Sequence, residues 1–425
     1  MRVLVVGSGG REHALCWKLR QSPLLTELYC APGNPGIAEV ADLVPIAPDE
    51  IQKLADFAQE MNIDLTVVGP ELPLTLGLAD ELDERGIAVF GPRQGAAELE
   101  GSKVFAKEFM ARHGIPTAAF EVVHDANEAR EAMGKFGFPV VLKADGLAAG
   151  KGVLIVGYQE EADDALKMLF EDRRFGRAAD RVVVEECLEG EELSFIALSD
   201  GERLLNFATS KDYKRIGEDD TGPNTGGMGA HSPSGVLSAE SASGVLENVM
   251  RPTISGMAAE GRPFVGVLYA GLMLTDDGPK VLEYNVRFGD PEAQPLFMRL
   301  EDDLLPVLAS GASGRFEVSR LHFRKAATAC IVLASAGYPG DPIKGESISG
   351  ISAARELEGA EVFHAGTAMK EGKLVASGGR VLNVCGSGSD LKGALRQAYE
   401  AASRIHWPSK VLRRDIGRRV LTRES

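Results

Sequence analysis

The sequence predicts a parallel α/β fold for the first hundred residues and mixed sheets with antiparallel strands for the rest. Up to about residue 100, the short apolar runs RVLVV, LTVVG and IAVFG alternate with helical stretches, as in doubly wound sheets. These runs are continuous rather than alternating, which is typical of strands buried on both faces. Later segments carry hairpin signals instead. A length of 425 residues corresponds to about three domains at roughly 150 residues each.

The N-terminal elements follow a regular order. A strand over 2–6 leads into a helix over 12–20, and further strands are expected over 65–69 and 87–91. After a break near 98–102, Phe105, Phe109 and Met110 recur at helical spacing. Because Gly114 and Pro116 then stop that pattern, we expect a helix that begins at 103.

The middle and the end of the chain have a different character. Residues 139–156 are expected to form a strand, a glycine-rich loop and a second strand, and 181–198 a strand pair joined by an acidic turn. Residues 269–290 should form a hairpin that turns at Asp276-Asp277-Gly278. A third, mixed α/β region opens near 325 and closes on an amphipathic helix over 391–405.

Composition restricts the function classes. Lys and Arg number 46 against 62 Asp and Glu, a net charge of −16, and a field of this sign repels nucleic acids and anionic membranes. The five cysteines form no CxxC pair, which favours a reducing compartment over a disulfide framework. The apolar run Val3 to Val6 is too short for a signal peptide, and no stretch reaches membrane-spanning length. We therefore expect a cytoplasmic protein.

The first chemical motif is Gly7-Ser8-Gly9-Gly10, between the first strand and its helix. Loop N–H groups and a helix N-terminus there favour a bound phosphate. A dinucleotide fingerprint would need glycine where Glu12 stands, and the second strand ends at Asn34 without a ribose-binding acid. The pattern therefore favours a smaller phosphorylated ligand over NAD, with a plain strand–helix turn as the alternative.

The second motif is a strand that delivers Lys143 into a loop containing Gly146, Gly150, Lys151 and Gly152. Such a loop can close over a polyphosphate while lysines neutralise its charge. It is not a P-loop, because Gly152 stands where that motif requires Ser or Thr. Lys103 offers another phosphate ligand, and the alternative is a surface hairpin with incidental lysines.

Two further motifs carry oxygen ligands and charge. Glu283, Asn285 and Arg287 alternate, so they should share one strand face, where carboxylate and amide oxygens suit Mg²⁺ and the guanidinium could clamp an anion. The alternative is a salt-bridged sheet face. The charged run 209–215, with Asp212, leads into the glycine-rich stretch 219–229, which we expect to be an irregular substrate-facing loop.

Taken together, these motifs identify a family. The chain resembles the phosphoribosylamine–glycine ligases (glycinamide ribonucleotide synthetases) of the ATP-grasp superfamily through GSGGREHAL, APGNPG, TVVGPE, LEGSKVFAKEFMARHGIPTA, VLKADGLAAGKGV, DTGPNTGGMGA, RFGDPEAQ, GYPGD and RRDIG. The resemblance runs from residue 7 to 417. It implies an N-terminal substrate domain over 1–102, an ATP-grasp domain over 103–318 with a glycine-rich lid at about 120–190, and a C-terminal domain over 319–425.

The resemblance also implies a reaction and a site. Glycine would take the γ-phosphoryl group of ATP, and 5-phosphoribosylamine would attack the resulting acyl phosphate to give glycinamide ribonucleotide, ADP and phosphate. By motif, the ATP residues are Lys103, Lys143, Gly146, Gly150, Lys151, Gly152, Glu185, Leu188 and Glu191. Glu283 and Asn285 would bind Mg²⁺ or Mn²⁺. Asp212 and Arg287 would orient glycine, with Lys143 as a further catalytic residue, and Gly9, Gly10, Glu71 and Asn224 would lie nearest the phosphoribosylamine.

Some features depart from the family pattern. The family commonly has Gln and His where this chain has Lys211 and Tyr213, and no acid stands in 270–274, where many relatives place a second metal carboxylate. The alternatives are another ATP-grasp carboxylate–amine ligase, a carboxylase, or a non-catalytic ATP-binding regulator. The resemblance implies a monomer whose C-terminal domain packs beside the ATP-grasp domain and helps to frame the site.

Overall fold

The N-terminal region is a five-stranded parallel sheet. The computed structural model describes residues 1–147 and 152–423, and its first sheet has the order β3-β2-β1-β4-β5. These strands are β1 (Arg2–Gly7), β2 (Glu27–Pro32), β3 (Asp42–Leu43), β4 (Leu65–Val68) and β5 (Val89–Phe90). The helices around them are α1 (Gly10–Leu19), α2 (Ile51–Glu60), α3 (Glu71–Thr75), α4 (Leu78–Glu84) and α5 (Gln94–Gly101). All its strand pairs are parallel, as predicted.

Strand β1 is buried on both faces. Leu4 and Val6 belong to one hydrophobic cluster, which also includes residues of α2 and α4, while Val3 and Val5 belong to another with residues of α1. Alternate side chains of a strand point to opposite faces, so helices cover both sides of this sheet. The doubly wound prediction is confirmed.

A nine-stranded sheet links the central and C-terminal regions. Its order is β16-β15-β10-β11-β14-β17-β21-β18, with β22 beside β17. The strands are β10 (Glu191–Asp200), β11 (Leu204–Asp212), β14 (Gly229–Ser232), β15 (Val265–Thr275), β16 (Gly278–Asn285), β17 (Ala327–Ser335), β18 (Ala360–His364), β21 (Arg380–Gly388) and β22 (Lys410–Val411). The hairpin predicted at Asp276 to Gly278 is confirmed as β15–β16. The pairing of β14 with β17 puts the C-terminal region beside the central one, as expected.

A separate four-stranded sheet has the order β6-β9-β7-β8, with β6 (Phe120–Val123), β7 (Val140–Ala144), β8 (Val153–Val156) and β9 (Val182–Glu186). Helices α7 (Ala126–Phe136) and α8 (Gln159–Leu166) supply much of its hydrophobic core. The predicted pairing within 181–198 is wrong, because β9 belongs to this sheet and β10 to the larger one. Val182 and Val184 of β9 pack in the core formed with α7 and α8, whereas Phe195 of β10 packs in a different hydrophobic cluster. Tertiary packing therefore decides which strands pair, and the local sequence pattern does not encode it.

The glycine-rich stretch 219–229 is more regular than predicted. Strands β12 (Arg215–Gly217) and β13 (Thr221–Asn224) form an antiparallel ribbon, called the flap below. Asp219 and Asp220 make its turn with φ values of 56° and 55°. The prediction of an irregular loop is therefore wrong over 221–224, because Asp219 and Asp220 close a tight turn and Gly222 keeps a φ of 76° within the ribbon without interrupting it.

The remaining elements complete the three regions. The helices are α6 (Lys103–Arg112), α9 (Ala239–Val245), α10 (Arg251–Ala259), α11 (Ala293–Arg299), α12 (Leu304–Ala312), α13 (Ile351–Arg355), α14 (Leu391–Arg404) and α15 (Arg418–Arg423), and β19 (Thr367–Lys370) pairs with β20 (Lys373–Ala376). Short helical turns cover Ile37–Glu39, Lys167–Glu171, Gly176–Asp180, Glu218–Asp220 and Leu246–Met250. The predicted helices at 103 and at 391–405 are confirmed as α6 and α14. The Ser102 side chain caps α6 by accepting from the Phe105 N–H at 3.0 Å.

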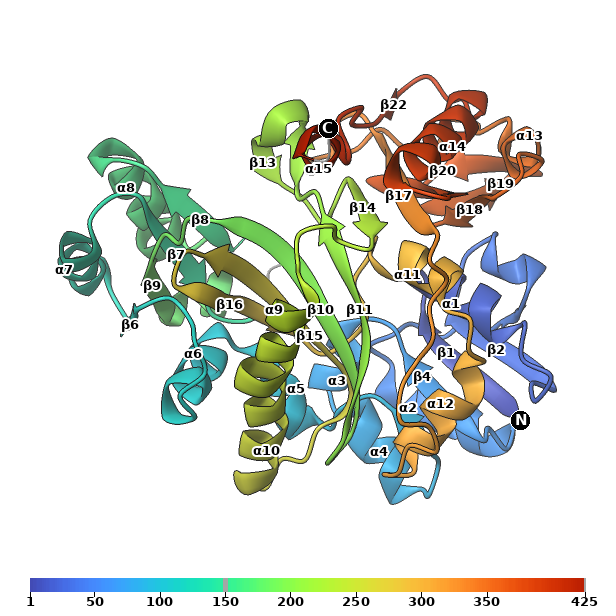
Figure 1. Cartoon of the computed structure of the whole chain (residues 1–425), viewed down its shortest axis with the longest axis horizontal. Helices are drawn as coiled ribbons and strands as arrows, with labels where there is room; N and C mark the ends of the chain where they lie inside the picture. The colour runs from blue at the N-terminus through green and yellow to red at the C-terminus, as the bar shows by residue number, and fades with distance from the viewer. Residues whose placement is uncertain (148–151, 424–425) are drawn as a thin grey trace.

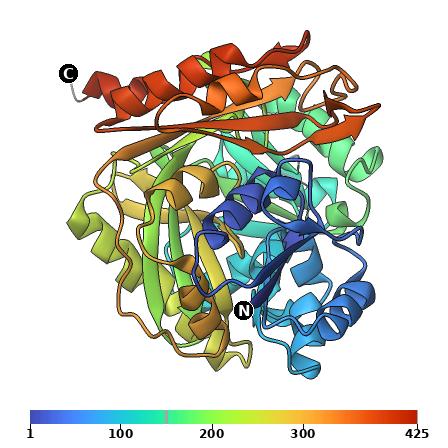
Figure 2. The same ribbon diagram turned by 90° about the vertical axis from the view of Figure 1, so that its right-hand side faces the viewer.

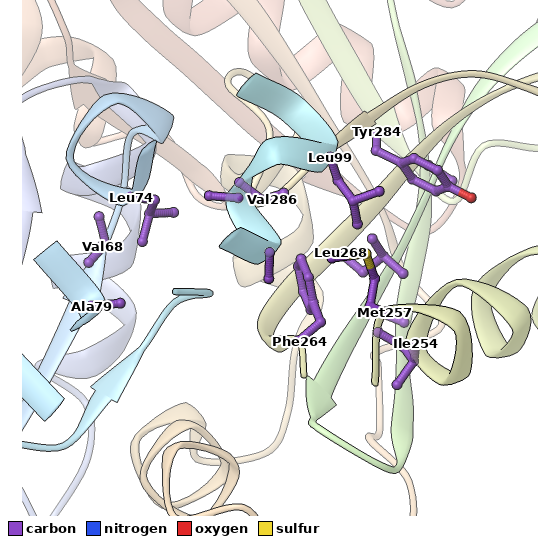
Figure 3. Close-up of a cluster of buried hydrophobic side chains, with 14 of the residues drawn as sticks. Val68, Leu74, Ala79, Leu99, Ile254, Met257, Phe264, Leu268, Tyr284 and Val286 are labelled. Carbon is purple, nitrogen blue, oxygen red and sulfur yellow. The ribbon is translucent and has the colours of Figure 1, made fainter. Parts of the chain in front are cut away.

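The N-terminal and central regions share a hydrophobic core, and a second cluster adds Cys330, Phe363 and Cys385 of the C-terminal region. One hydrophobic cluster runs from Val68 and Leu74 near the N-terminal sheet to Phe264, Leu268 and Val286 in the central region (Figure 3). The C-terminal region lies across both of the others (Figures 1 and 2). Burial of Val68 and Val286 in one cluster brings the start of α3 next to the end of β16.

The cysteines and the helix lengths bear on the predictions made from composition. All five cysteines lie in the described residues and are free thiols. Within residues 1–147 and 152–423, the helices are too short or too polar to cross a membrane.

A close approach at Gly10 yields a prediction about stability. A Cβ atom at this position would lie 1.7 Å from Nδ2 of Asn383 on β21 and 2.8 Å from Nε2 of Gln294 on α11. Gly10→Ala should therefore lower the free energy of unfolding by about 1–3 kcal/mol through overpacking. In the control Gly134→Ala, in the last turn of α7, a Cβ would meet nothing within 4 Å, and stability should rise by about 0.5–1 kcal/mol. Urea denaturation of both variants checks this, and equal stability of the two would contradict it.

Candidate active site

The candidate site lies where the end of β16 meets the loop between β1 and α1. Nη1 of Arg11, in the first turn of α1, donates to the Phe288 carbonyl at 3.0 Å. Arg287 beside it forms an ion pair with Glu71, the first residue of α3, at 3.1 Å. Two loops that follow strands of different sheets are thereby joined, and most of the residues singled out from the sequence gather around this junction.

Three buried charged side chains, called the triad, lie on the β7 side of the site: Lys107, Lys143 and Glu185. The carboxylate of Glu185 on β9 accepts ion pairs from Lys143 on β7 and from Lys107 on α6, each at 2.5 Å. The exposed fraction of the side chain is 2% for Glu185, 2% for Lys107 and 7% for Lys143. Burial lowers the pKa of Lys107 to about 8 despite Glu185. Nζ of Lys143 also donates to the Leu282 carbonyl of β16 at 2.8 Å, which fixes the ammonium beside that strand.

The predicted glycine-rich loop begins next to Lys103. Nζ of Lys103 donates to the Gly146 carbonyl at 2.8 Å, and burial lowers the pKa of this lysine. Gly146 has a φ of 102°, a conformation that side chains rarely tolerate. Gly152 accepts from the Ala144 N–H at 2.9 Å, whereas Gly150 and Lys151 lie outside the described residues. The first end of the loop thus meets a lysine predicted to hold phosphate, and its other described end pairs with the residue after Lys143.

Glu283 on β16 is surrounded by cations. Its carboxylate lies 3.5 Å from Nζ of Lys214. Burial alone would raise its pKa, but Lys214, Lys143 and Lys103 hold that pKa at about 2. Glu283 is therefore ionised, and with Asn285 two residues on, it offers the hard oxygen donors that suit Mg²⁺ or Mn²⁺.

The neighbouring strand adds no further carboxylate to this pair. Gly271 of β15 stands opposite Glu283, and a Cβ there would lie 3.3 Å from Cγ of Glu283. Among the residues that the structure describes, no cluster of three or more His, Cys, Asp or Glu side chains could hold a metal ion. A metal at Glu283 and Asn285 would thus depend on water and substrate oxygens for its other ligands.

An acidic crevice lies on the other side of Lys214. Asp212 at the end of β11, Glu192 and Ser194 of β10, and Tyr269 of β15 line it together with Lys214. The Tyr269 hydroxyl donates to Glu292 at 2.7 Å, which adds a further carboxylate. Burial, reinforced by Glu292, Glu192 and Glu283, raises the pKa of Asp212 to about 7 against the pull of Lys214. Carboxylates outnumber cations in this crevice, so it can stabilise an ammonium group.

Arg287 binds two carboxylates at once. Its Nη2 lies 2.5 Å from Glu100 of α5, in addition to the Nε contact with Glu71. Burial opposes ionisation of both acids, yet Arg287 and Arg11 hold the pKa of Glu71 at about 2. The pKa of Glu100 is raised to about 7, chiefly by burial and also by Glu71. One guanidinium therefore anchors the N-terminal region to the end of β16.

The N-terminal loop is closed by its own glutamate. Oε2 of Glu12 accepts from the Gly9 N–H at 2.6 Å, and its Oε1 pairs with Arg11 at 2.5 Å. Gly10, predicted to lie near substrate, packs against Asn383 and Gln294.

The C-terminal region reaches the same junction. Arg380 of β21 forms an ion pair with Asp290 at 3.2 Å, and Gln294 donates to that carboxylate at 2.7 Å. Nη1 of Arg380 also donates to the Gly226 carbonyl at 2.7 Å. The C-terminal region thus frames the site, as expected from the sequence.

Other predicted residues lie further along the same elements. Lys211 of β11 forms an ion pair with Glu191 of β10, so the departure at 211 supplies a partner for a residue predicted to contact ATP. Leu188 is half-buried in the connection between β9 and β10. Asn224 lies on β13 opposite Arg215.

The sequence analysis missed several members of the site. Glu292 stands within RFGDPE and Lys214 within a charged run, so both were visible as candidates. Glu100 and Lys107 stand within LEGSKVFAKEFMARHGIPTA, but neither they nor Arg380 carry a local sign of an ion pair, because their partners lie far along the chain.

With this geometry established, the comparisons are informative. Models of the phosphoribosylglycinamide synthetase family match residues 1–100 (N domain), 101–293 (ATP-grasp domain) and 328–419 (C domain). The chain is 51% identical over 424 residues to a phosphoribosylamine–glycine ligase of Mesorhizobium japonicum, covering 100% of this chain and 99% of that protein. The crystal structure of phosphoribosylamine–glycine ligase from Thermotoga maritima is 37% identical, with a TM-score of 0.85 and coverage of 98% of this chain and 100% of that one.

A more distant neighbour shares only the fold. The biotin carboxylase domain of 2-oxoglutarate carboxylase from Hydrogenobacter thermophilus is 19% identical, with a TM-score of 0.72 over 97% of this chain and 91% of that one. The predicted fold class, with a central ATP-grasp domain between an N-terminal parallel sheet and a C-terminal domain, is confirmed.

The buried triad leads to a prediction. Glu185→Gln would leave Lys107 and Lys143 buried without a carboxylate, and should cost about 3–5 kcal/mol of unfolding free energy. The matched control is Glu121→Gln on the adjacent strand β6, because Glu121 pairs with Lys135 at the surface, where little change is expected. Urea denaturation measures both, and a similar small effect in the two variants would refute a structural role for the triad.

Proposed function

The chain belongs to the phosphoribosylglycinamide synthetase family, and from that premise we propose how its residues carry the ATP-dependent ligation of glycine to 5-phosphoribosylamine. The protein is a C–N bond-forming ligase of purine biosynthesis that uses ATP. The single observation that carries the assignment of roles is the position of Glu283. This ionised carboxylate lies between the lysines of a phosphate site and an acidic crevice.

We assign ATP to the lysine side of the site. Lys103 and Lys143 neutralise its phosphates, and the loop with Gly146, Gly150, Lys151 and Gly152 covers them. Glu185, Leu188 and Glu191 contact the nucleoside where β9 leads into β10. Support comes from two ammonium groups whose charge a polyphosphate would offset. Lys143 is buried and donates to the Leu282 carbonyl of β16, and the half-buried Lys103 donates to the Gly146 carbonyl at the start of the loop.

We assign the divalent metal to Glu283 and Asn285, with Mg²⁺ or Mn²⁺ as the ion. When bound, such an ion neutralises negative charge on the phosphate oxygens during transfer. The ionised state of Glu283 supports this assignment, because a protonated carboxyl group would bind a cation poorly.

We assign glycine to the acidic crevice and Arg287. The excess of carboxylates in the crevice favours the ammonium group of glycine, and Asp212, which lines the crevice, is its predicted partner. The guanidinium of Arg287 orients the carboxylate and stabilises the charge that develops on its oxygens. One carboxylate oxygen attacks the γ-phosphorus, ADP leaves, and glycyl phosphate forms.

The second step joins the amine. The nitrogen of phosphoribosylamine attacks the acyl carbon, the C–O bond to phosphate breaks, and the nitrogen loses one proton. We assign this substrate to Gly9, Gly10, Glu71 and Asn224. A phosphate that approaches the Gly9 N–H would replace the Glu12 carboxylate that now accepts from it. Exclusion of water by the covering loop would protect the acyl phosphate from hydrolysis.

We further propose that the chain works in the cytoplasm as a monomer, with domains over 1–102, 103–318 and 319–425 and a lid at about 120–190. The scattered free thiols support a reducing compartment. The four-stranded sheet, whose strands lie between Phe120 and Glu186, supports the lid.

Omission of each substrate in turn tests the proposed function. With Mg-ATP, glycine and phosphoribosylamine generated in situ, ADP release should require all three, with one glycinamide ribonucleotide formed per ADP. Release with a different acid or amine, but not with these, would indicate another ATP-grasp ligase. ATP binding without any turnover would indicate a regulator.

Arg287→Lys tests the glycine assignment. The lysine keeps the positive charge but loses the planar contact, so kcat/KM for glycine should fall by at least about 100-fold while ATP affinity persists. The control is Arg251→Lys on α10, because Arg251 pairs with Glu247 at 3.0 Å on the surface. Unchanged glycine kinetics in Arg287→Lys would remove this residue from the mechanism.

A further inference from the structure

A buried arginine near the C-terminus contacts the flap from a distant part of the chain. The side chain of Arg413, in the RRDIG segment 413–417, is only 1% exposed. Its guanidinium pairs with Asp415 at 2.7 Å and with Asp220, in the turn of the flap, at 2.9 Å. Its Nη1 also donates to the Arg215 carbonyl of β12 at 3.0 Å. Figure 1 shows β13 next to α15, at the C-terminal end of the chain.

Tyr213 joins the same assembly. The Arg413 guanidinium carbon lies 5.3 Å from the centre of the Tyr213 ring, a cation–π distance. The phenol oxygen of Tyr213 accepts from the Gly417 N–H at 2.9 Å. This tyrosine is one of the two departures from the family pattern, and it gives the C-terminal segment a second contact at the base of the flap.

The phenol also reaches inward to β14. Nδ1 of His231 lies 2.9 Å from the Pro233 carbonyl, which can only accept, so Nδ1 carries the proton. Nε2 is therefore the acceptor, and the Tyr213 hydroxyl donates to it at 3.3 Å. Burial lowers the pKa of His231 to about 4, which agrees with a neutral ring. The Tyr213 hydroxyl thus accepts one hydrogen bond and donates another, so it cannot shift without breaking one of them.

Lys214 stands in the chain between Tyr213 and Arg215, both of which are anchored. Its ammonium lies 3.5 Å from the carboxylate of Glu283. Its carbonyl accepts from both N–H and Oγ1 of Thr225, each at 2.7 Å, which closes the base of the flap. Arg215, which Arg413 holds, stands opposite Asn224 in the ribbon. Movement of Arg215 would therefore displace both Lys214 and Asn224.

We propose that Arg413 is a positioning residue that fixes the flap so that Lys214 and Asn224 face the glycine and phosphoribosylamine sites. The inference rests on the proposed function, because it concerns those substrates. Arg413 touches no reacting atom and acts through Asp220, the Arg215 carbonyl and the Tyr213 ring. The ATP lysines Lys103 and Lys143 stand on α6 and β7, outside this assembly.

Arg413→Lys is the direct test, with Arg419→Lys as its matched control. A lysine at 413 keeps the charge, but its single nitrogen has three N–H donors and cannot reproduce the bidentate pair with Asp415 together with both flap contacts. Arg419 pairs with the other oxygen of Asp220 at 3.1 Å, but its side chain is 61% exposed. We expect kcat/KM for glycine and phosphoribosylamine to fall at least about tenfold in Arg413→Lys, since a small misplacement of binding groups is costly. ATP affinity should persist, and Arg419→Lys should match the parent.

Limited trypsin digestion gives a readout that does not depend on turnover. Cleavage after Lys214 and Arg215 should become faster in Arg413→Lys, because the flap is released, and should stay at the parent rate in Arg419→Lys. If Arg413→Lys does not fold, Asp220→Asn is used instead, since it weakens the flap contact and leaves the Arg413–Asp415 pair intact.

The outcomes separate the two ideas. A parent enzyme without ligase activity would overturn the proposed function before any variant is compared. An active parent with unchanged kinetics and unchanged trypsin cleavage in the variant would overturn the positioning role. An equal loss of ATP affinity and of glycine kinetics would also overturn it, because the effect would then be a general loss of structure.

Discussion

The guanidinium of Arg287, held between Glu71 and Glu100, is the interaction on which the rest of the site depends. It joins the start of α3, the end of α5 and the loop after β16, three places that the chain reaches separately. Leu99 and Val286, the chain neighbours of Glu100 and Arg287, belong to the hydrophobic cluster of Figure 3, which shields part of this junction from water and strengthens the ion pairs. Burial, with repulsion from Glu71, raises the pKa of Glu100 to about 7, whereas Arg287 and Arg11 hold the pKa of Glu71 at about 2. The N-terminal region and the central sheet therefore cannot move apart without leaving buried charges unpaired.

From this anchor the site extends in two directions of opposite charge. Lys103, Lys107 and Lys143 give one side its cations, and Asp212, Glu192 and Glu292 give the other an excess of carboxylates. Glu283 and Lys214 stand between them as an oppositely charged pair. Such an arrangement suits a reaction in which a polyphosphate meets an amino acid, because each side attracts one substrate and repels the other. Catalysis by positioning and charge neutralisation follows from it, without a protein nucleophile.

Local patterns predicted the elements well where one segment sufficed. The apolar run of β1, the helical spacing in α6 and the Asp-Asp-Gly turn between β15 and β16 each carry their own signal, and the structure confirms them. Prediction failed where partners come from distant segments. The β9 and β10 runs look like a hairpin, but the two strands belong to different sheets. Because their partners also lie on distant segments, no local pattern near Glu100 or Lys107 indicates their ion pairs. The flap is a different case, since its two strands are neighbours and the glycine-rich pattern hid a tight turn at Asp219 and Asp220. The motif residues were found because spacing along one strand or loop is visible in sequence.

The central claim is that glycine becomes an acyl phosphate before the amine attacks. The most direct test uses glycine labelled with ¹⁸O in both carboxylate oxygens, with the released phosphate analysed by mass spectrometry. The account predicts one ¹⁸O atom in each phosphate released, because the oxygen that joins the acyl and phosphoryl groups leaves with phosphorus when the C–N bond forms. Phosphate without label, formed together with glycinamide ribonucleotide, would show that the carboxylate was never phosphorylated and would contradict the account.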